Sequence, residues 1–157
     1  MVLDIFVKDC KYSISCGYSG FALFRSEVLR IWNPELGKLY KQFHDSLLED
    51  SDDRGKLEFM EFYKKYKERK SVEEKIKKIL DEYDKPYNEG MRLFTYHSDC
   101  DGEINPKECV LLLKSFARVD PEKFEKSLHN QFLRESYDIW LKMLAYAIEN
   151  KKNIIFG

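Results

Sequence analysis

The sequence carries almost no net charge and contains no long apolar run. Its 27 basic and 28 acidic residues leave a formal charge of -1, which disfavours nucleic acid as a partner of the chain as a whole. No apolar stretch reaches the roughly 20 residues of a membrane-spanning helix, and the apolar start at 2–7 is too short for a secretory signal. We therefore expect a cytoplasmic protein without a membrane partner.

Sequence motifs of common catalytic chemistry are also absent. There is no His-Glu-x-x-His pair, no glycine-rich phosphate loop after a strand and no Gly-x-Ser-x-Gly turn. The four cysteines lack the close spacing of structural zinc sites and are expected to be reduced thiols. A nucleophile at Cys100 is the lesser alternative, because its acidic neighbours would raise the pKa of that thiol. We predict a protein without enzymatic activity.

What the sequence does contain is ample material for a core. Hydrophobic residues make up 43% of the 157 residues and aromatic residues 15%, which predicts one globular domain over 1–157. Ten tyrosines and 11 phenylalanines exceed what one core usually needs. An exposed aromatic patch and a homodimer are therefore allowed.

Hydrophobic periodicity predicts a mainly helical α+β fold. Strands are expected at 2–7 and 153–156, with 12–15 pairing beside the first, so the two chain ends should form a small sheet. For 91–96 the pattern fits either a helix or a strand. Helices are expected from about Ser19, which can cap the first one, to Trp32, and from Pro34, with an apolar stripe of Leu36, Tyr40, Phe43 and Leu47. After an acidic turn at 50–55, the next helix should have Phe59, Phe62, Tyr63 and Tyr66 on one side. Further helices are expected from Ser71 as a capping box, from Pro106, after Pro121 and from Phe132 to Glu149.

The segment 97–108 matches the calcium-binding loop of a helix-loop-helix unit at most positions. That loop requires oxygen ligands at positions 1, 3, 5 and 12, and glycine at position 6. Asp99, Asp101, Gly102 and Glu108 fit, whereas His97 offers an imidazole at position 1, where calcium requires oxygen. Without metal, Glu108 has another role, because it can complete a capping box at the start of the next helix.

A second segment, 50–61, repeats the calcium pattern less well. Asp50, Asp52, Gly55 and Glu61 fit, but Arg54 places a positive charge at position 5. Both segments precede amphipathic stretches, as a calcium-binding pair requires. Calcium binding at the two segments is therefore an alternative function. The first functional hypothesis, a binding protein, needs no cofactor.

The turn before the first helix is a candidate anion site. Gly17-Tyr18-Ser19-Gly20 enters a helix, and backbone N–H groups at a helix N-terminus attract anions. Arg25 follows one and a half turns later and can hold an anion in a fork. The ligand-binding residues we predict from this turn and the acidic loop are Tyr18, Ser19, Arg25, His97, Asp99 and Asp101.

The segment 64–70 is locally basic, with further lysines up to Lys78 and with Tyr63 and Tyr66 interleaved. Such a mixture suits nucleic acid or a phosphate-bearing ligand. Glu68, Glu73 and Glu74 dilute the positive charge, so a solvated helix face is the favoured interpretation.

Three segments together resemble a diffuse group of uncharacterised bacterial and phage proteins. The segments are 17–25, the Ser-Asp-Cys-Asp-Gly turn at 98–102, and 137–156 with its Ile-Ile-Phe-Gly end. The group starts with a Met-Gly-Leu-Asp-Ile-like segment, where this chain has Val2 in place of the glycine. The resemblance has no counterpart at about 37–90 and carries no established activity. It implies a small cytosolic, phage-borne protein.

The first functional hypothesis is accordingly a non-enzymatic binding protein. Its partner is either a host protein, which it inhibits, or a small anionic ligand, which it sequesters. The alternative is a calcium-binding helix-loop-helix protein.

Overall fold

The computed structural model describes residues 2–52, 59–82, 87–97, 102–118, 122–123, 126 and 130–157, with the backbone alone at 47–52, 59–63 and 87–88. Helices predominate and accompany a four-stranded antiparallel sheet, which confirms the predicted fold class. The elements are β1 (Val2–Val7), β2 (Ser13–Gly17), α1 (Tyr18–Trp32), α2 (Pro34–Asp52), α3 (Phe59–Asp81), α4 (Tyr87–Tyr96), β3 (Gly102–Ile104), α5 (Pro106–Ala117), α7 (Gln131–Asn150) and β4 (Ile154–Phe156).

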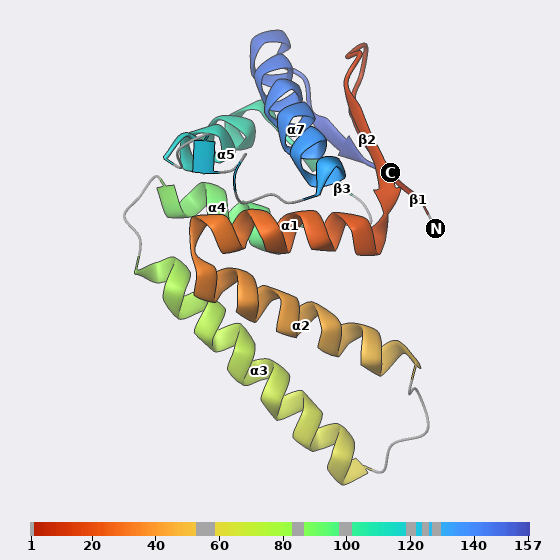
Figure 1. Ribbon diagram of the computed structural model, residues 1–157, viewed down its shortest axis with the longest axis vertical. Coiled ribbons are helices and arrows are strands. Elements are labelled where there is room, and N and C mark those ends of the chain that lie inside the picture. The colour runs from red at the N-terminus through yellow and green to blue at the C-terminus, as the bar shows by residue number, and fades with distance from the viewer. Residues whose placement is uncertain are drawn as a thin grey trace.

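The sheet joins the two ends of the chain, as predicted, and its strand order is β2-β1-β4-β3. Buried and exposed residues alternate strictly along β1, so that Leu3, Ile5 and Val7 face the helices. Ile5 lies opposite Phe156 of β4, and the termini therefore meet at the sheet (Figure 1). The edge strand β3 is missing from the sequence-based prediction, which assigned Gly102–Ile104 to the calcium-like loop before the next helix.

The core is built around α1 and α7 and is largely aromatic. Trp140 of α7 is fully buried, and its ring centroid lies 6.4 Å from Phe24, 5.9 Å from Phe94 and 6.4 Å from Phe156. These rings come from α1, α4, β4 and α7. The cluster therefore fixes α1 against α4, α7 and the sheet, and Figure 1 shows the α2–α3 hairpin on the other side of α1.

α1 and α2 pack with their backbones almost in contact. A Cβ atom added to Gly37 would lie 2.4 Å from the backbone nitrogen of Arg30, so only glycine fits there. Asn33 ends α1 and begins α2, because its side-chain oxygen accepts a hydrogen bond from the backbone N–H of Leu36 (3.0 Å). This tight connection sets α2 directly alongside α1.

α2 and α3 form a hairpin that extends away from the sheet (Figure 1). The structure corrects three predictions in this part. Ser71 does not start a helix but lies inside the continuous α3, because nothing in the sequence around it breaks the helix. Residues 50–52 are helical in α2, not part of a turn. Tyr66, which we expected on the apolar side, is 51% exposed.

The start of α1 also differs from the prediction. Gly17, not Ser19, is the N-cap, and no side chain caps this helix end. Ser19 lies one residue inside the first turn and is exposed. The segment 91–96 is helical, as the C-terminal part of α4.

Candidate ligand-binding site

A cleft of about 160 Å³ lies between α1 and α2. One wall is a single face of α1, because residues at positions i, i+3, i+4 and i+7 project from the same side of a helix. The other wall is the facing side of α2. The lining residues are Ser19, Ala22, Leu23, Ser26, Tyr40, Lys41, His44 and Asp45.

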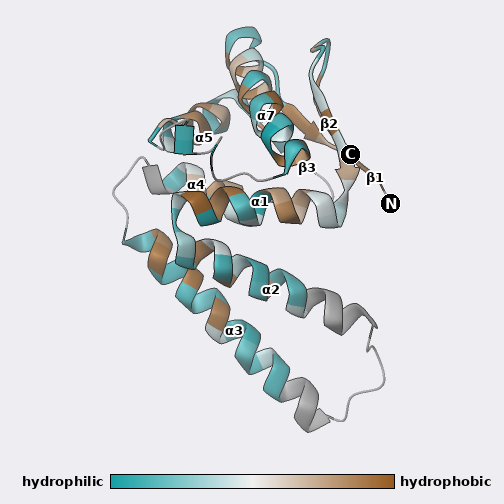
Figure 2. Ribbon diagram, in the orientation of Figure 1, coloured by the Kyte–Doolittle hydropathy of each residue, from teal (hydrophilic) through white to brown (hydrophobic). Residues whose placement is uncertain are grey.

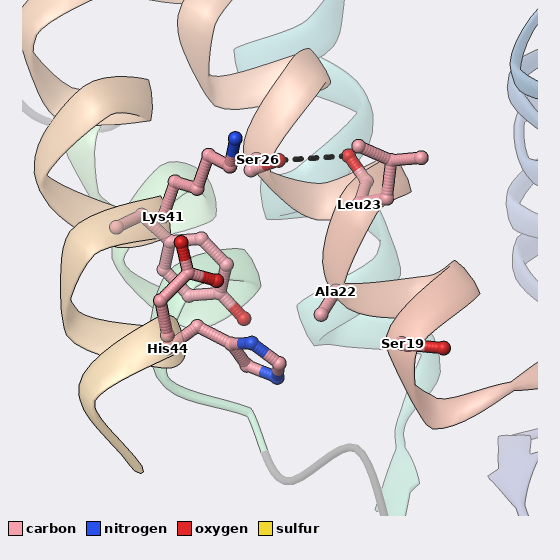
Figure 3. Close-up of a pocket in the computed structure, with 8 residues that line it drawn as sticks. Ser19, Ala22, Leu23, Ser26, Lys41 and His44 are labelled. Atoms are coloured by element: carbon pink, nitrogen blue, oxygen red, sulfur yellow. Dashed lines mark hydrogen bonds between the residues drawn. The ribbon is translucent and has the colours of Figure 1, made fainter. Parts of the chain in front are cut away.

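The polar groups of the cleft come mostly from α2. Figure 3 shows Lys41 extending toward Ser26 and the His44 ring projecting into the space between the two helices. The Ser26 hydroxyl donates to the backbone oxygen of Leu23 (2.9 Å), so it is already engaged within α1. Lysine, imidazole and aspartate therefore form the open, charged side of the cleft, and alanine and leucine form its apolar side.

Arg25 lies deeper than the cleft and is only 4% exposed. Its guanidinium carbon is 4.7 Å from the ring centroid of Phe21, 5.7 Å from Phe94 and 5.8 Å from Tyr40. Among the described residues no carboxylate pairs with it, and its Nε has no hydrogen-bond partner. A buried cation without a carboxylate partner is costly, since a buried charge ordinarily has a counter-ion.

Tyr40 connects this buried charge to the cleft. Arg25 donates from Nη1 to the Tyr40 hydroxyl oxygen at 3.2 Å, and Tyr40 itself lines the cleft. The His44 ring stacks on the Tyr40 ring, with centroids 6.3 Å apart and planes inclined by 28°. The Tyr40 side chain thus lies between the guanidinium of Arg25 and the cleft.

The cleft contains a serine, a histidine and an aspartate, but these are not arranged as a catalytic relay. Over the part of the chain that the structure describes, no hydrogen bond joins Ser19 to His44. Asp45 is adjacent to His44 in the same helix, so the two side chains diverge by about 100° around the axis. A nucleophile needs its base within hydrogen-bond reach. The arrangement is therefore suited to holding a ligand.

The predicted site residues that the structure describes lie on two sides of one aromatic group. Tyr18 is half-buried at the start of α1, and Ser19 lines the cleft. The His97 ring packs on Phe156 at 4.5 Å, Phe156 contacts Phe21 at 5.7 Å, and Phe21 covers the Arg25 guanidinium. Arg25 and His97 are thus separated by two rings and do not share a cavity.

The loop 97–108 is closed by its own side chains at its described ends. His97 Nε2 lies 3.2 Å from the backbone oxygen of Glu103, which is position 7 of the calcium pattern. Glu108 and Asn105 form the predicted capping box, with Asn105 Oδ1 accepting from the Glu108 N–H (2.9 Å) and Glu108 Oε1 accepting from the Asn105 N–H (3.1 Å). Gly102 has φ of +104°, the conformation that a glycine at position 6 supplies.

The other predicted calcium ligands fall outside the description. Asp99 and Asp101 lie outside the described residues, as does Cys100, and for Asp50, Asp52 and Glu61 only the backbone is described. Within the described side chains, no group of three or more potential ligands is placed to hold a metal ion.

A second, more open hollow of about 480 Å³ lies between α4 and α5. It brings His97 and Glu108 together with the apolar Leu93 and Leu111 and the half-exposed Tyr96. Its charges already have partners, since Arg92 forms an ion pair with Asp81 and Glu108 belongs to the capping box. This leaves the α1–α2 cleft as the better candidate.

Two of the cysteines that the structure describes, Cys16 and Cys109, are not activated. Burial raises the pKa of Cys109 to about 12, and nearby Glu108 adds to this effect. Burial, with Asp4, also raises the pKa of Cys16. Thiolates are the reactive form of cysteine, so neither residue is suited to nucleophilic chemistry.

Sequence reasoning found Ser19 and Arg25 but missed Tyr40, Lys41 and His44. Tyr40 was assigned to the apolar stripe of α2, where it does lie, but its hydroxyl also contacts Arg25. The available signal was Lys41, His44 and Asp45, which recur at helical spacing beside that stripe.

Fold and cleft together define a mainly helical α+β protein with a small, polar-sided cleft between two helices. No known protein family, curated protein or solved structure matches the chain. Of the helices in the described ranges, none is both long and apolar enough to cross a lipid bilayer.

Proposed function

We propose that this chain is a non-enzymatic binding protein that sequesters a small anionic ligand in the cleft between α1 and α2. The observation that carries the proposal is Arg25, a cation that is 4% exposed and has no carboxylate partner among the described residues. An anion in the adjacent cleft would offset the cost of burying that charge.

The chemistry at the mouth of the cleft supports the same ligand class. Lys41 supplies a mobile ammonium group, and His44 supplies a ring nitrogen on the stacked face of Tyr40. Among the described residues, Asp45 is the one carboxylate that lines the space, so a ligand that also carries a hydroxyl or amino donor fits best. The Arg25 field reaches the ligand through Tyr40, in a region where water screens it weakly.

The volume limits the size of the ligand. The cleft of about 160 Å³ is smaller than the roughly 300–1,000 Å³ of sites for drug-sized molecules. An inorganic oxyanion or a short organic acid fits, whereas a nucleotide would extend into solvent.

The test is a calorimetric titration with phosphate, sulfate, citrate and a set of short hydroxy and amino acids. We expect at least one of these anions to bind, and Lys41→Gln and Tyr40→Phe each to weaken its binding. Lys38→Gln is the matched control, because Lys38 is an exposed lysine of α2 outside the cleft. Equal loss in Lys38→Gln, or no binding of any anion by the wild-type protein, would refute the proposal.

The alternative, calcium binding at 97–108, has one observation in its favour. α4 ends at Tyr96, Gly102 has φ of +104° and α5 begins at Pro106, which together follow the helix-loop-helix pattern. The placement of His97 speaks against it. Its ring nitrogen lies 3.2 Å from the carbonyl oxygen of Glu103 at position 7, where a calcium ion would take that oxygen as a ligand.

A further inference from the structure

The outward face of α3 carries a concentration of positive charge that the chain as a whole does not have. Residues 64–78 include eight basic and three acidic residues, an excess of five positive charges. Because the formal charge of the whole chain is -1, the remainder carries an excess of six negative charges. Such separation creates a local field that attracts polyanions.

Five of these lysines are exposed and form no ion pair within the described residues. At about 100° per residue they fall within roughly 160° of the helix circumference. This face is opposite to the one that buries Val72, Ile76 and Ile79. Figure 2 shows the hydrophilic character of most of α3 along the projecting hairpin. The five are Lys64, Lys70, Lys75, Lys77 and Lys78.

The same face has an aromatic side chain at its edge. Tyr66 is 51% exposed and lies about 40° around the helix from Lys70 and about 20° from Lys77. The lysines extend over about 21 Å along the axis, at 1.5 Å per residue, which matches several phosphates of an extended strand. Exposed tyrosine beside lysine is the combination that binds a stacked base and its phosphates.

We infer that the outward face of α3 is a docking surface for single-stranded nucleic acid, through phosphate contacts of these lysines and base stacking on Tyr66. An anionic membrane fits less well. A helix that lies on a membrane inserts an apolar face, whereas the apolar side chains of α3 are buried within the fold. Glu74 falls between Lys70 and Lys78 on this face, and Glu68 and Glu73 are on the same segment. These carboxylates keep the binding weak and strongly dependent on salt.

The experiment is fluorescence anisotropy of the full chain with a labelled 20-nucleotide single strand, a duplex of the same sequence and, separately, vesicles containing phosphatidylserine. We expect the single strand to bind most tightly. If all five lysines contact phosphates, log affinity should fall with log salt with a slope whose magnitude is at most about 3.5. Replacing Lys70, Lys75 and Lys77 by Gln should reduce the magnitude of that slope by about 2. Tyr66→Ala should weaken the single strand more than the duplex.

The matched control replaces Lys8, Lys107 and Lys114 by Gln. These three lysines are exposed and lie outside α3, and their replacement removes the same three positive charges. We expect this variant to bind the single strand as the wild type does. Any of four results would overturn the inference: no binding at low salt, equal loss in both triple variants, tighter binding to the duplex, or binding to vesicles alone.

Discussion

The guanidinium of Arg25 lies among the rings of Phe21, Tyr40 and Phe94 and donates to one phenol oxygen. Contacts of a cation with aromatic rings contribute about 0.5–2 kcal/mol, less than the several kcal/mol that desolvating an ion costs. A side chain kept in such a place is destabilising on its own. Its retention is understandable where an anion binds nearby.

Replacing Arg25 by Met should therefore abolish anion binding without lowering the free energy of unfolding. Met fills a similar volume and contacts aromatic rings favourably, so we expect the free energy of unfolding to stay unchanged or to rise by up to about 2 kcal/mol. Anion binding in the cleft should be lost. Urea denaturation gives the first quantity and calorimetry the second.

Arg25→Ala is the control for packing, because it removes the charge and also leaves a cavity, and we expect it to be less stable than Arg25→Met. If Arg25→Met unfolded as readily as Arg25→Ala, the guanidinium would be a structural group and the argument from its burial would fail.

At the scale of elements, the segment from α4 through β3 to α5 resembles a calcium loop in sequence. Its described ends are held by contacts between the protein's own groups. The capping box between Asn105 and Glu108 starts α5, and His97 lies against the Glu103 carbonyl. β3 then pairs with β4, with Ile104 opposite Ile154 in the core. Each of these contacts joins groups of the protein itself.

We accordingly expect millimolar calcium to leave the melting temperature of the protein unchanged, since a ligand that binds the folded state raises it. Differential scanning fluorimetry in chelator-treated buffer measures this, with magnesium as the parallel addition. A rise with calcium that disappears in Asp101→Ala would establish the alternative function in place of the proposed one.

The elements also show what the sequence could reveal. Strand alternation at 2–7, the proline after Asn33 and the capping box at Asn105 are local signals, and each element they predicted is present. The serine at 71 resembles a cap but lies in an unbroken helix, since a cap motif marks a start only where the preceding residues leave the helix.

The cleft was harder to predict than the elements around it. Its walls come from two separate stretches, 19–26 and 40–45, and their approach depends on Gly37, at which any side chain would collide with α1. Nothing in the local pattern around Tyr40 reveals that its hydroxyl meets Arg25. Local periodicity predicts which face is buried but not which polar atoms meet across two helices.

At the scale of the whole molecule, buried ionisable groups set the response to alkaline pH. Burial raises the pKa of Tyr137 from 10.0 to about 12 and that of Cys109 from 9.0 to about 12. Both groups therefore hold their protons more tightly in the folded state than in the unfolded chain. The free energy of unfolding is unaffected by them below about pH 9 and falls as the pH rises toward 12, because the unfolded chain releases those protons first.

We expect the melting temperature to fall steadily above pH 9, and Tyr137→Phe to make the decline shallower between pH 10 and pH 12, since phenylalanine has no proton to release. Tyr66→Phe is the control, because that ring is half-exposed on α3, and it should leave the profile unchanged. Thermal melts from pH 8 upward at constant ionic strength measure the effect. Parallel profiles for Tyr137→Phe and the wild type would show that the Tyr137 hydroxyl reaches water in the folded protein. The alkaline sensitivity would then belong to the other groups with a raised pKa, Cys109 and Cys16 among them.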